Sequence, residues 1–374
     1  MAINKINLCV LGLGGVGTSF LQILAKSPAL NQKFTLLALA NSRSAVYIPA
    51  GIPSSEPITS SPSKWVDAHP EAKPLELESL FQSLTAVKGQ TIVVDNSSSA
   101  DLAELYPTIL KLGLHLCTPN KKGWSGELKL WTNVLSAASE ANTLSYGEST
   151  VGAGLPILTT LKDLVETGDE IVKIEGVLSG TLSYIFNNYS PAKPQEDKPT
   201  FSSIIHTAKS LGYTEPDPRD DLSGVDVARK LTILSRQIPS LAKKLENGYA
   251  SVPTKSLVPP VLENANTAAE YLDRLAEGDD FFDSLREEAE KEGKVLRYVG
   301  VIDGQTGEIK CSLEKYPATH PFATSLSGSD NIISFTTARY PAPRPLLVQG
   351  SGAGGDVTAM GVWADCLRVW ERRA

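Results

Sequence analysis

The chain has 374 residues, of which 41% are hydrophobic and 21% charged, and its formal net charge is -7. This length predicts two or more domains, and the acidic balance argues against a nucleic-acid-binding protein, which would normally carry a basic face. The sequence contains no apolar stretch of about 18 residues and no recognisable signal peptide, so we expect neither a membrane segment nor secretion.

The first elements form a recognisable unit. Residues 5–11 (KINLCVL) are typical of a short buried strand, a glycine-rich loop covers 12–17, and a helical pattern runs over 18–27. A second apolar strand follows over 34–40. This order of strand, loop, helix and strand predicts the first βαβ unit of a dinucleotide-binding fold.

The loop Gly12-Leu-Gly14-Gly15-Val16-Gly17 has the spacing that a bound pyrophosphate requires. Gly12 allows the tight turn, Gly14 lets the phosphates approach the backbone, and Gly17 lets the helix pack closely on the strand. The helix N-terminus adds N–H donors and the positive end of its dipole. We therefore predict that residues 12 and 14–17 bind a nicotinamide dinucleotide; the alternative is a glycine turn that serves packing alone.

The second strand ends at Asn41-Ser42-Arg43, where an NAD-binding protein usually carries an acid for the adenosine ribose. Arg43 could instead face the 2′-phosphate of NADP, or it could be a solvated surface charge. Both interpretations stay open, so we expect NAD or NADP as the cofactor.

Two further strands are predicted over 91–95 and 114–118, and polar residues follow each of them. These are Asn96, Ser97 and Ser98 after the first strand and Thr118, Asn120, Lys121 and Lys122 at the end of the second. Ligands bind at the carboxyl ends of parallel strands, so we expect these loops to gather at one edge of the sheet. Residues 49–64, rich in Pro and Ser, predict a surface loop.

From Glu148 onward the pattern changes. Helices are expected over 157–167 and 201–211 and from about 223, and strands over 172–179, 295–302, 308–316 and 331–340, with a Pro-rich loop over 190–200. The turns between the later strands predict antiparallel hairpins. The glycine-rich stretch 349–355 precedes a closing helix over 356–372.

The predicted fold class is therefore α/β, with an N-terminal Rossmann-type domain and an α+β catalytic and dimerisation domain. We expect residues 1–147 with about 341–374 to form the first domain, and 148–340 the second.

The segment 208–230 (AKSLGYTEPDPRDDLSGVDVARK) concentrates charge. Pro216 and Pro218 stiffen its loop. Asp226 and Lys230 lie four residues apart on one helix face, a spacing that by itself favours an ordinary surface ion pair. The rigid loop and the paired charges together suit a zwitterionic substrate, because carboxylates can hold its ammonium group while a lysine acts on its oxygen.

This segment resembles the homoserine dehydrogenase signature, A-x3-G-aromatic-T-E-P-x-P-x2-D-L-x-G-x-D-x3-K, at every fixed position. The resemblance extends to 12–17, 96–98, 118–122, 148–156 and 179–186, covers nearly the whole chain, and is closest to the single-function fungal enzymes. It implies reversible NAD(P)-dependent hydride transfer between L-homoserine and L-aspartate 4-semialdehyde, in the biosynthesis of threonine, methionine and isoleucine.

The resemblance also implies site residues. The substrate would contact Gly180, Thr181, Glu215, Asp221, Asp226 and Lys230, and the cofactor would contact Asn96, Ser97, Ser98, Thr118, Lys121 and Gly352. A sodium ion would lie near Glu148 and the carbonyls of Val151, Ala153 and Leu155, although the same stretch equally suits the start of a helix near Pro156. The family forms homodimers through the second domain.

Lys121 and Lys230 are the two candidate acid–base residues. A lysine of ordinary pKa, about 10.4, is a poor base at neutral pH, but burial and a second cation lower that pKa. We favour Lys121 for the proton transfer and Lys230, oriented by Asp226, for holding the substrate oxygen. Without the resemblance, Lys121 would be taken for a surface lysine beside Lys122.

The sequence disfavours three rival functions. A different hydroxy-amino-acid dehydrogenase is disfavoured by the long signature over 208–230. A phosphorylating semialdehyde dehydrogenase would need a nucleophilic cysteine with a base, and Cys117, at a strand end, has no evident histidine partner. A redox sensor that binds NAD(P)(H) would be expected to have lost some of Lys121, Glu215, Asp226 and Lys230. The four cysteines (Cys9, Cys117, Cys311 and Cys366) form no C-x-x-C pair, so we expect no zinc site and reduced thiols in a cytoplasmic protein.

Overall fold

The computed structural model describes residues 4–54, 56–193 and 198–374. The chain divides into two compact units, one of Met1–Pro156 with Ala353–Ala374 and the other of Ile157–Gly352. The chain passes between the units after Pro156 and after Gly352. Both boundaries lie later in the chain than those suggested from the sequence, which were after residues 147 and about 340. Within the described ranges, no helix is both long and apolar enough to cross a membrane.

The first unit contains a seven-stranded sheet of order β4-β3-β2-β1-β5-β6-β7. Its strands are β1 (Ile6–Leu11), β2 (Phe34–Ala40), β3 (Ser44–Tyr47), β4 (Lys73–Pro74), β5 (Thr91–Asp95), β6 (His115–Cys117) and β7 (Ser145–Tyr146). The strands from β2 through β1 to β7 run parallel, while β3 and β4 add an antiparallel edge. The central strands β1 and β5 are buried along their whole length, as expected for a parallel sheet that is covered on both faces.

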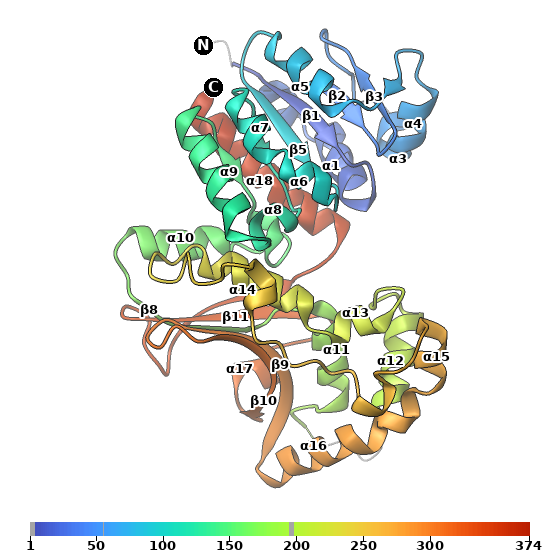
Figure 1. The fold of residues 1–374 in the computed structure, drawn as a ribbon, viewed down its shortest axis with the longest axis vertical. Helices are drawn as coiled ribbons and strands as arrows, with labels where there is room; N and C mark the ends of the chain where they lie inside the picture. Colours follow the sequence, from blue (N-terminus) through green and yellow to red (C-terminus); the bar gives the residue numbers. More distant parts are fainter. Residues whose placement is uncertain (1–3, 55, 194–197) are drawn as a thin grey trace. The chain divides into compact units, whose positions relative to one another are not determined.

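The helices of the first unit flank this sheet (Figure 1). They are α1 (Gly15–Lys26), α2 (Pro28–Lys33), α3 (Glu56–Ser60), α4 (Pro62–Ala68), α5 (Leu77–Thr85), α6 (Ala100–Glu104), α7 (Tyr106–Lys111), α8 (Lys122–Ser125), α9 (Leu128–Glu140), η1 (Glu148–Thr150) and α18 (Gly355–Arg373). The prediction of a Rossmann-type α/β fold joined to an α+β part is confirmed.

The last helix of the chain belongs to the first unit. Figure 1 shows α18, in red, running beside α1 near the N-terminal strand. The rings of Phe20 and Trp363 are stacked with their centroids 4.0 Å apart, and the Trp363 indole N–H donates to the Phe20 carbonyl at 2.9 Å. The C-terminal helix therefore completes the core around β1.

The surface loop expected over 49–64 is wrong in part, because its second half forms α3 and the start of α4. Ile58 is buried in the core of the unit, and Pro62 occupies the first turn of α4, where a missing N–H is harmless. The Pro- and Ser-rich composition predicted a loop, whereas Ser61 and Pro62 lie at the start of α4. Residue 55 lies outside the described residues.

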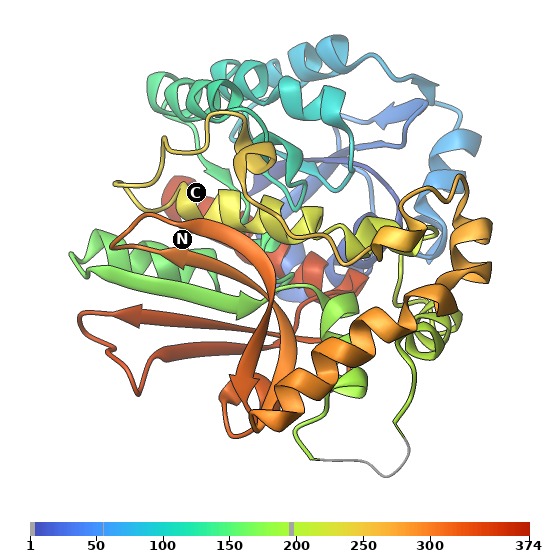
Figure 2. The ribbon, with the colours of Figure 1, turned by 60° about the horizontal axis from the view of Figure 1, so that its bottom comes forward.

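The second unit is built on an antiparallel sheet of order β10-β9-β8-β11-β12 (Figure 2). Its strands are β8 (Ile171–Val177), β9 (Lys294–Asp303), β10 (Ile309–Pro317), β11 (Asp330–Thr337) and β12 (Leu346–Ser351). The hairpin predicted around residues 303–307 is present as the antiparallel pair β9 and β10. The next two predicted strands do not pair with each other, because β11 lies between β8 and β12 in the sheet. The edge strand β12 was not expected, because it runs into the glycine-rich stretch.

Helices α11, α14 and α16 pack against β9, over a core that includes Val177, Val299 and Phe322. The helices of this unit are α10 (Leu158–Glu166), α11 (Gly180–Tyr189), α12 (Phe201–Ser210), α13 (Pro218–Leu222), α14 (Val225–Ser235), α15 (Ala268–Asp273), α16 (Asp279–Lys291) and α17 (Pro321–Thr324), with η2 (Gly248–Ser251), η3 (Pro260–Leu262) and η4 (Leu275–Gly278). Residues 194–197 of the expected Pro-rich loop lie outside the described residues.

Candidate active site

The glycine loop between β1 and α1 has the shape of a phosphate cradle. Gly12 has a φ of +85°, and a Cβ there would lie 2.6 Å from the Ser97 amide nitrogen. A Cβ at Gly17 would lie 2.0 Å from the Gly12 carbonyl oxygen, whereas one at Gly14 or Gly15 would meet nothing within 4 Å. The space in front of the α1 N-terminus is therefore open, and Val16 lies in the first turn of that helix.

A buried hydrogen-bond network joins the carboxyl ends of β5 and β6. The Asp95 carboxylate, fully buried, accepts from the Ser97 hydroxyl at 2.6 Å, from the Tyr106 hydroxyl at 2.6 Å and from the Asn120 amide at 3.0 Å. The Thr118 hydroxyl donates to the Asp95 carbonyl at 2.7 Å. These contacts fix the two loops that the sequence placed at the cofactor edge, with Ser98 exposed beside them.

Burial raises the pKa of Asp95, because a carboxylate without water is disfavoured, although the donors from Ser97 and Tyr106 act in the opposite direction. Sequence reasoning missed Asp95 and Tyr106 as members of this site. The only available signal was an acid at the end of the apolar run 91–95, since its partners are separated from it along the chain.

The side chains that the network positions are Asn96 and Lys121. Both amide atoms of Asn96 are buried and have no hydrogen-bonding partner in the part of the chain that the structure describes. Lys121 is half-buried at the N-cap of α8, whereas its neighbour Lys122 is exposed. Asn96 therefore offers an unused donor and acceptor next to Gly17, as expected of a group that binds a polar ligand.

Arg43, at the end of β2, is engaged with another side chain. Its guanidinium contacts the Asp67 carboxylate at 2.7 Å, and the same carboxylate accepts from the Asn41 amide at 2.8 Å. The Arg43 side chain is 75% exposed, so this ion pair is weak and screened by solvent. A ligand phosphate at this position would compete with Asp67 for the arginine.

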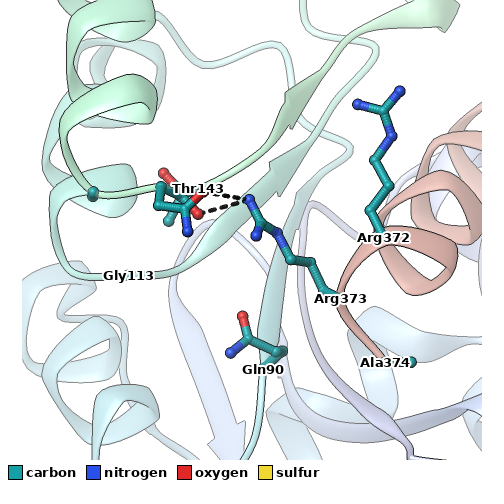
Figure 3. Close-up of a pocket in the computed structure, with 8 residues that line it drawn as sticks. Gln90, Gly113, Thr143, Arg372, Arg373 and Ala374 are labelled. Carbon is teal, nitrogen blue, oxygen red and sulfur yellow. Dashed lines mark hydrogen bonds between the residues drawn. The ribbon is translucent and has the colours of Figure 1, made fainter.

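A cavity of about 480 Å³ lies at the opposite edge of the same sheet (Figure 3). Gln90 and Thr143, which precede β5 and β7, line it together with Arg372 and Arg373. Arg373 donates to the carbonyl and to the side-chain oxygen of Asn142, both at 2.9 Å. Because this cavity lies at the amino ends of the strands, it is separate from the expected cofactor edge.

In the second unit, Lys230 of α14 is a buried ammonium group. The residue is 6% exposed, and its Nζ donates to the Leu178 carbonyl at 2.6 Å and to the Asp226 carboxylate at 2.8 Å. The four-residue spacing suggested a surface pair, but the lysine end of this pair is buried. α14 begins after Gly224, whose φ is +74° and where a Cβ would lie 2.0 Å from the Tyr298 hydroxyl oxygen, so the signature glycine is required sterically.

The loop before α13 is tied to the start of α11, whose first residue is Gly180. The Thr181 hydroxyl lies 2.6 Å from the Tyr213 carbonyl and 2.9 Å from the Asp221 carboxylate, whose other oxygen accepts from the Glu215 backbone N–H at 2.8 Å. Burial raises the pKa of Asp221. The structure thus gathers Thr181, Glu215 and Asp221 into one cluster, with the Glu215 side chain exposed.

The stretch 148–155 forms a tight turn in the first unit. Gly152 and Ala153 both have positive φ, +74° and +55°, and the alanine is strained in this conformation. Glu148 is 5% exposed, and its backbone N–H donates to the carboxylate of Asp365, which is 1% exposed, at 2.9 Å. Burial raises the pKa of Asp365 to about 7.

Arg368 contacts both acids, at 2.5 Å from Asp365 and 3.6 Å from Glu148. Sequence reasoning missed Asp365 and Arg368, which lie far from Glu148 in the chain. Across the described ranges, no cluster of three or more His, Cys, Asp or Glu side chains could hold a metal ion, so a cation at this turn would depend on carbonyls such as those of Val151, Ala153 and Leu155.

A glycine cradle on a Rossmann-type sheet, with a buried lysine in a second unit, defines an NAD(P)-dependent oxidoreductase. A family model described as "homoserine dehydrogenase, NAD binding domain" matches residues 12–147, and one described as "homoserine dehydrogenase" matches 156–367. The homoserine dehydrogenase of Emericella nidulans is 46% identical, over 98% of this chain and 99% of the relative.

Solved structures agree. A crystal structure of a protein of unknown function from Candida auris is similar with a TM-score of 0.86 and 42% identity, over 99% of both chains. A hyperthermophilic archaeal homoserine dehydrogenase in complex with NADPH has the same fold, with a TM-score of 0.71 at 22% identity over 99% of both chains. The chain belongs to the homoserine dehydrogenase family, of the single-function fungal type, which confirms the prediction from the signature.

Proposed function

We propose a division of roles among these residues in the reaction of the family, the reversible NAD(P)-dependent interconversion of L-homoserine and L-aspartate 4-semialdehyde. The observation that carries the proposal is Lys230, a buried ammonium group with two fixed acceptors. A buried charge is costly unless it is paired, so such a lysine is retained for chemistry more readily than for stability.

The first unit suits the cofactor. Gly14 and Gly15 leave room for a pyrophosphate at the α1 N-terminus, and Asn96 supplies an unused amide at the carboxyl end of β5. When bound, the nicotinamide ring accepts the hydride from homoserine or returns it to the aldehyde. Ser97, Thr118 and the neighbouring network would hold the loops around it; Arg43 and Gly352 complete the proposed cofactor contacts.

The second unit suits the amino acid. The Asp221 carboxylate lies beside the Thr181 hydroxyl and accepts from the Glu215 backbone N–H. Asp221 and the exposed Glu215 carboxylate would hold the substrate ammonium group, with Gly180 at the start of α11 nearby. The contacts of Lys230 with Asp226 and with the Leu178 carbonyl stabilise the charged ammonium. Lys230 would therefore polarise the substrate oxygen, which becomes negative as the hydride is transferred.

Lys121 would then move the proton of the substrate hydroxyl. It is half-buried at the N-cap of α8, next to Asn120, which is anchored on Asp95. A proton donor or acceptor needs a defined position relative to the reacting oxygen. The hydrogen bond between Asn120 and Asp95 fixes the backbone next to Lys121 and so helps to define the position of this lysine.

A monovalent cation at the 148–155 turn is part of the same proposal. Glu148 and Asp365 place two buried carboxyl groups beside one arginine, so the turn can accommodate additional positive charge. Carbonyl oxygens are suitable ligands for a hard cation such as sodium. We assign this site a structural role.

A homodimer through the second unit and a cytoplasmic location complete the proposal. Leu347 on the edge strand β12 and Tyr340 before it are each about 40% exposed, and exposed apolar edges are commonly covered by association. Light scattering tests the dimer. The four cysteines are free thiols, as is usual in a reducing compartment.

The test follows absorbance at 340 nm with L-homoserine and NAD or NADP, for wild type and for Lys121→Ala, Lys230→Ala and Lys122→Ala. We expect large losses of kcat in the first two variants and near wild-type turnover in the exposed neighbour Lys122→Ala. Activity retained in Lys230→Ala would refute the proposed role of this lysine. Equal losses in Lys121→Ala and Lys122→Ala would remove the special role of Lys121.

A further inference from the structure

The carbonyl that holds Lys230 has a second donor. Asn331 of β11 is 1% exposed, and its Nδ2 donates to the Leu178 carbonyl at 3.0 Å. The same oxygen accepts from Lys230 Nζ at 2.6 Å, so both of its lone pairs are occupied. Leu178 lies between the end of β8 and the start of α11, where the ladder pairs of β8 with its neighbours have ended.

The Asn331 side chain is clamped on its other side by glycine backbone. A Cβ at Gly352 would lie 2.2 Å from both Cγ and Nδ2 of Asn331. Asn331 is also the β-ladder partner of Gly350, whose φ is +153°. The glycines of this stretch therefore allow the chain to lie directly on the amide, which limits the amide to one position.

Asn331 is a poor choice for stability alone. Its Oδ1 is buried and has no hydrogen-bonding partner within the described residues, which is unfavourable because the oxygen loses its hydrogen bonds to water. An apolar side chain of similar size would avoid this cost. Within the described ranges, the Asn331 side chain makes one hydrogen bond, the one to the Leu178 carbonyl, so we infer that its role is exerted there.

We propose that Asn331 is a positioning residue for Lys230 and acts through the Leu178 carbonyl; this inference rests on the role proposed for Lys230. A lysine side chain is long and flexible, so fixed acceptors determine where its ammonium group lies. Asp226 provides one acceptor from the same helix. The Leu178 carbonyl provides the other, and Asn331 keeps that peptide from rotating.

The central variant is Asn331→Leu, which keeps a similar volume, removes the donor and also removes the buried unpaired oxygen. We expect the thermal midpoint to be unchanged or raised. The kcat for homoserine oxidation should fall about tenfold to a hundredfold, as for misplacement of a reacting group by about 1 Å, while KM for the cofactor stays constant. If the leucine does not fit beneath Gly352, Asn331→Ala carries the same expectation for kcat.

The matched control is Thr337→Val on the same strand. Thr337 is 1% exposed and its hydroxyl donates to Asp169 at 2.8 Å, so the variant loses a buried hydrogen bond without touching Lys230 or Leu178. It should lower the thermal midpoint and leave kcat unchanged.

The possible outcomes distinguish a failure of the positioning role of Asn331 from a failure of the role proposed for Lys230. A kcat within twofold of wild type in both Asn331 variants, with Lys230→Ala inactive, would overturn the positioning role and leave the lysine assignment standing. An active Lys230→Ala would overturn both. A fall in kcat with an unaltered thermal midpoint in Asn331→Leu, and the reverse pattern in Thr337→Val, is the result expected.

Discussion

His115, the first residue of β6, should make the first unit sensitive to acid. It is 1% exposed, its Nε2 lies 2.8 Å from the Gln90 side-chain oxygen, and its Nδ1 accepts from the Leu144 backbone N–H at 3.0 Å. These contacts require the neutral ring with its proton on Nε2, because a protonated Nδ1 would face the Leu144 N–H. Burial, and secondarily the charge of Arg373, lower the pKa of His115 to about 4.

The sign and size of the effect follow from proton binding. As the pH falls below about 6.5, the unfolded chain takes up a proton at His115, while the folded chain does so only near pH 4. The free energy of unfolding is therefore highest above pH 6.5 and falls as the pH drops to about 4. At about 1.4 kcal/mol per pKa unit, this group contributes at most about 3 kcal/mol.

The assay compares urea unfolding of wild type and His115→Asn between pH 7.5 and 4.5. Asn keeps an acceptor for the Leu144 N–H but does not titrate. All five tryptophans lie in the first unit, so tryptophan fluorescence reports on that unit alone. The stability difference between the two proteins should change by about 2–3 kcal/mol over this range. The reasoning would be refuted if the stability difference between wild type and His115→Asn did not change with pH. It would also be refuted if His206→Asn, a substitution at an exposed histidine, gave the same pH-dependent change.

Two further substitutions test the cofactor edge. Asp67→Ala should release Arg43 and raise the ratio of kcat/KM for NADP to that for NAD by up to about fivefold, since an exposed ion pair contributes at most about 1 kcal/mol; an unchanged ratio, measured at 340 nm, would make Arg43 a solvated charge. Tyr106→Phe should lower the stability of the first unit by about 1.5–3 kcal/mol, because it removes a donor to the buried Asp95, and should weaken NAD(P)H binding measured by fluorescence titration. If the variant lost stability but bound NAD(P)H as tightly as wild type, the Asp95 network would have no role in cofactor binding.

Elements with a strong local signal were predictable. The strand over 34–40 agrees with the prediction to the residue, because a continuous apolar run bounded by polar residues has few other interpretations. The short helix α3 was missed because it packs against α1, which is distant in the chain. The edge strand β12 pairs with β11, its neighbour along the chain, but was missed because its second half lies in the glycine-rich stretch. Residues rich in Pro, Ser or Gly carry weak local preferences, so tertiary contacts determine their structure there.

In the candidate site, too, some features follow from local sequence and others depend on contacts between distant residues. The glycine spacing and the signature identify which residues are chemically interesting, but they do not reveal burial. The spacing of Asp226 and Lys230 is that of a solvated pair, whereas the burial of Lys230 and its contact with the Leu178 carbonyl, 52 residues away, depend on the fold. Asn331 is 153 residues from Leu178, so no local pattern could have identified it.

The stacking of Trp363 on Phe20 has a consequence for biosynthesis of the chain. The strands of the first unit leave the ribosome early, but the helix that covers α1 is made only after all of residues 157–352. Domains usually fold in the order in which they are synthesised. Here the second unit, which is one continuous segment, can finish first, while the first unit keeps an uncovered apolar face until α18 has been made. A nascent chain that stalls after β12 would therefore expose Phe20 and its neighbours to chaperones or to aggregation.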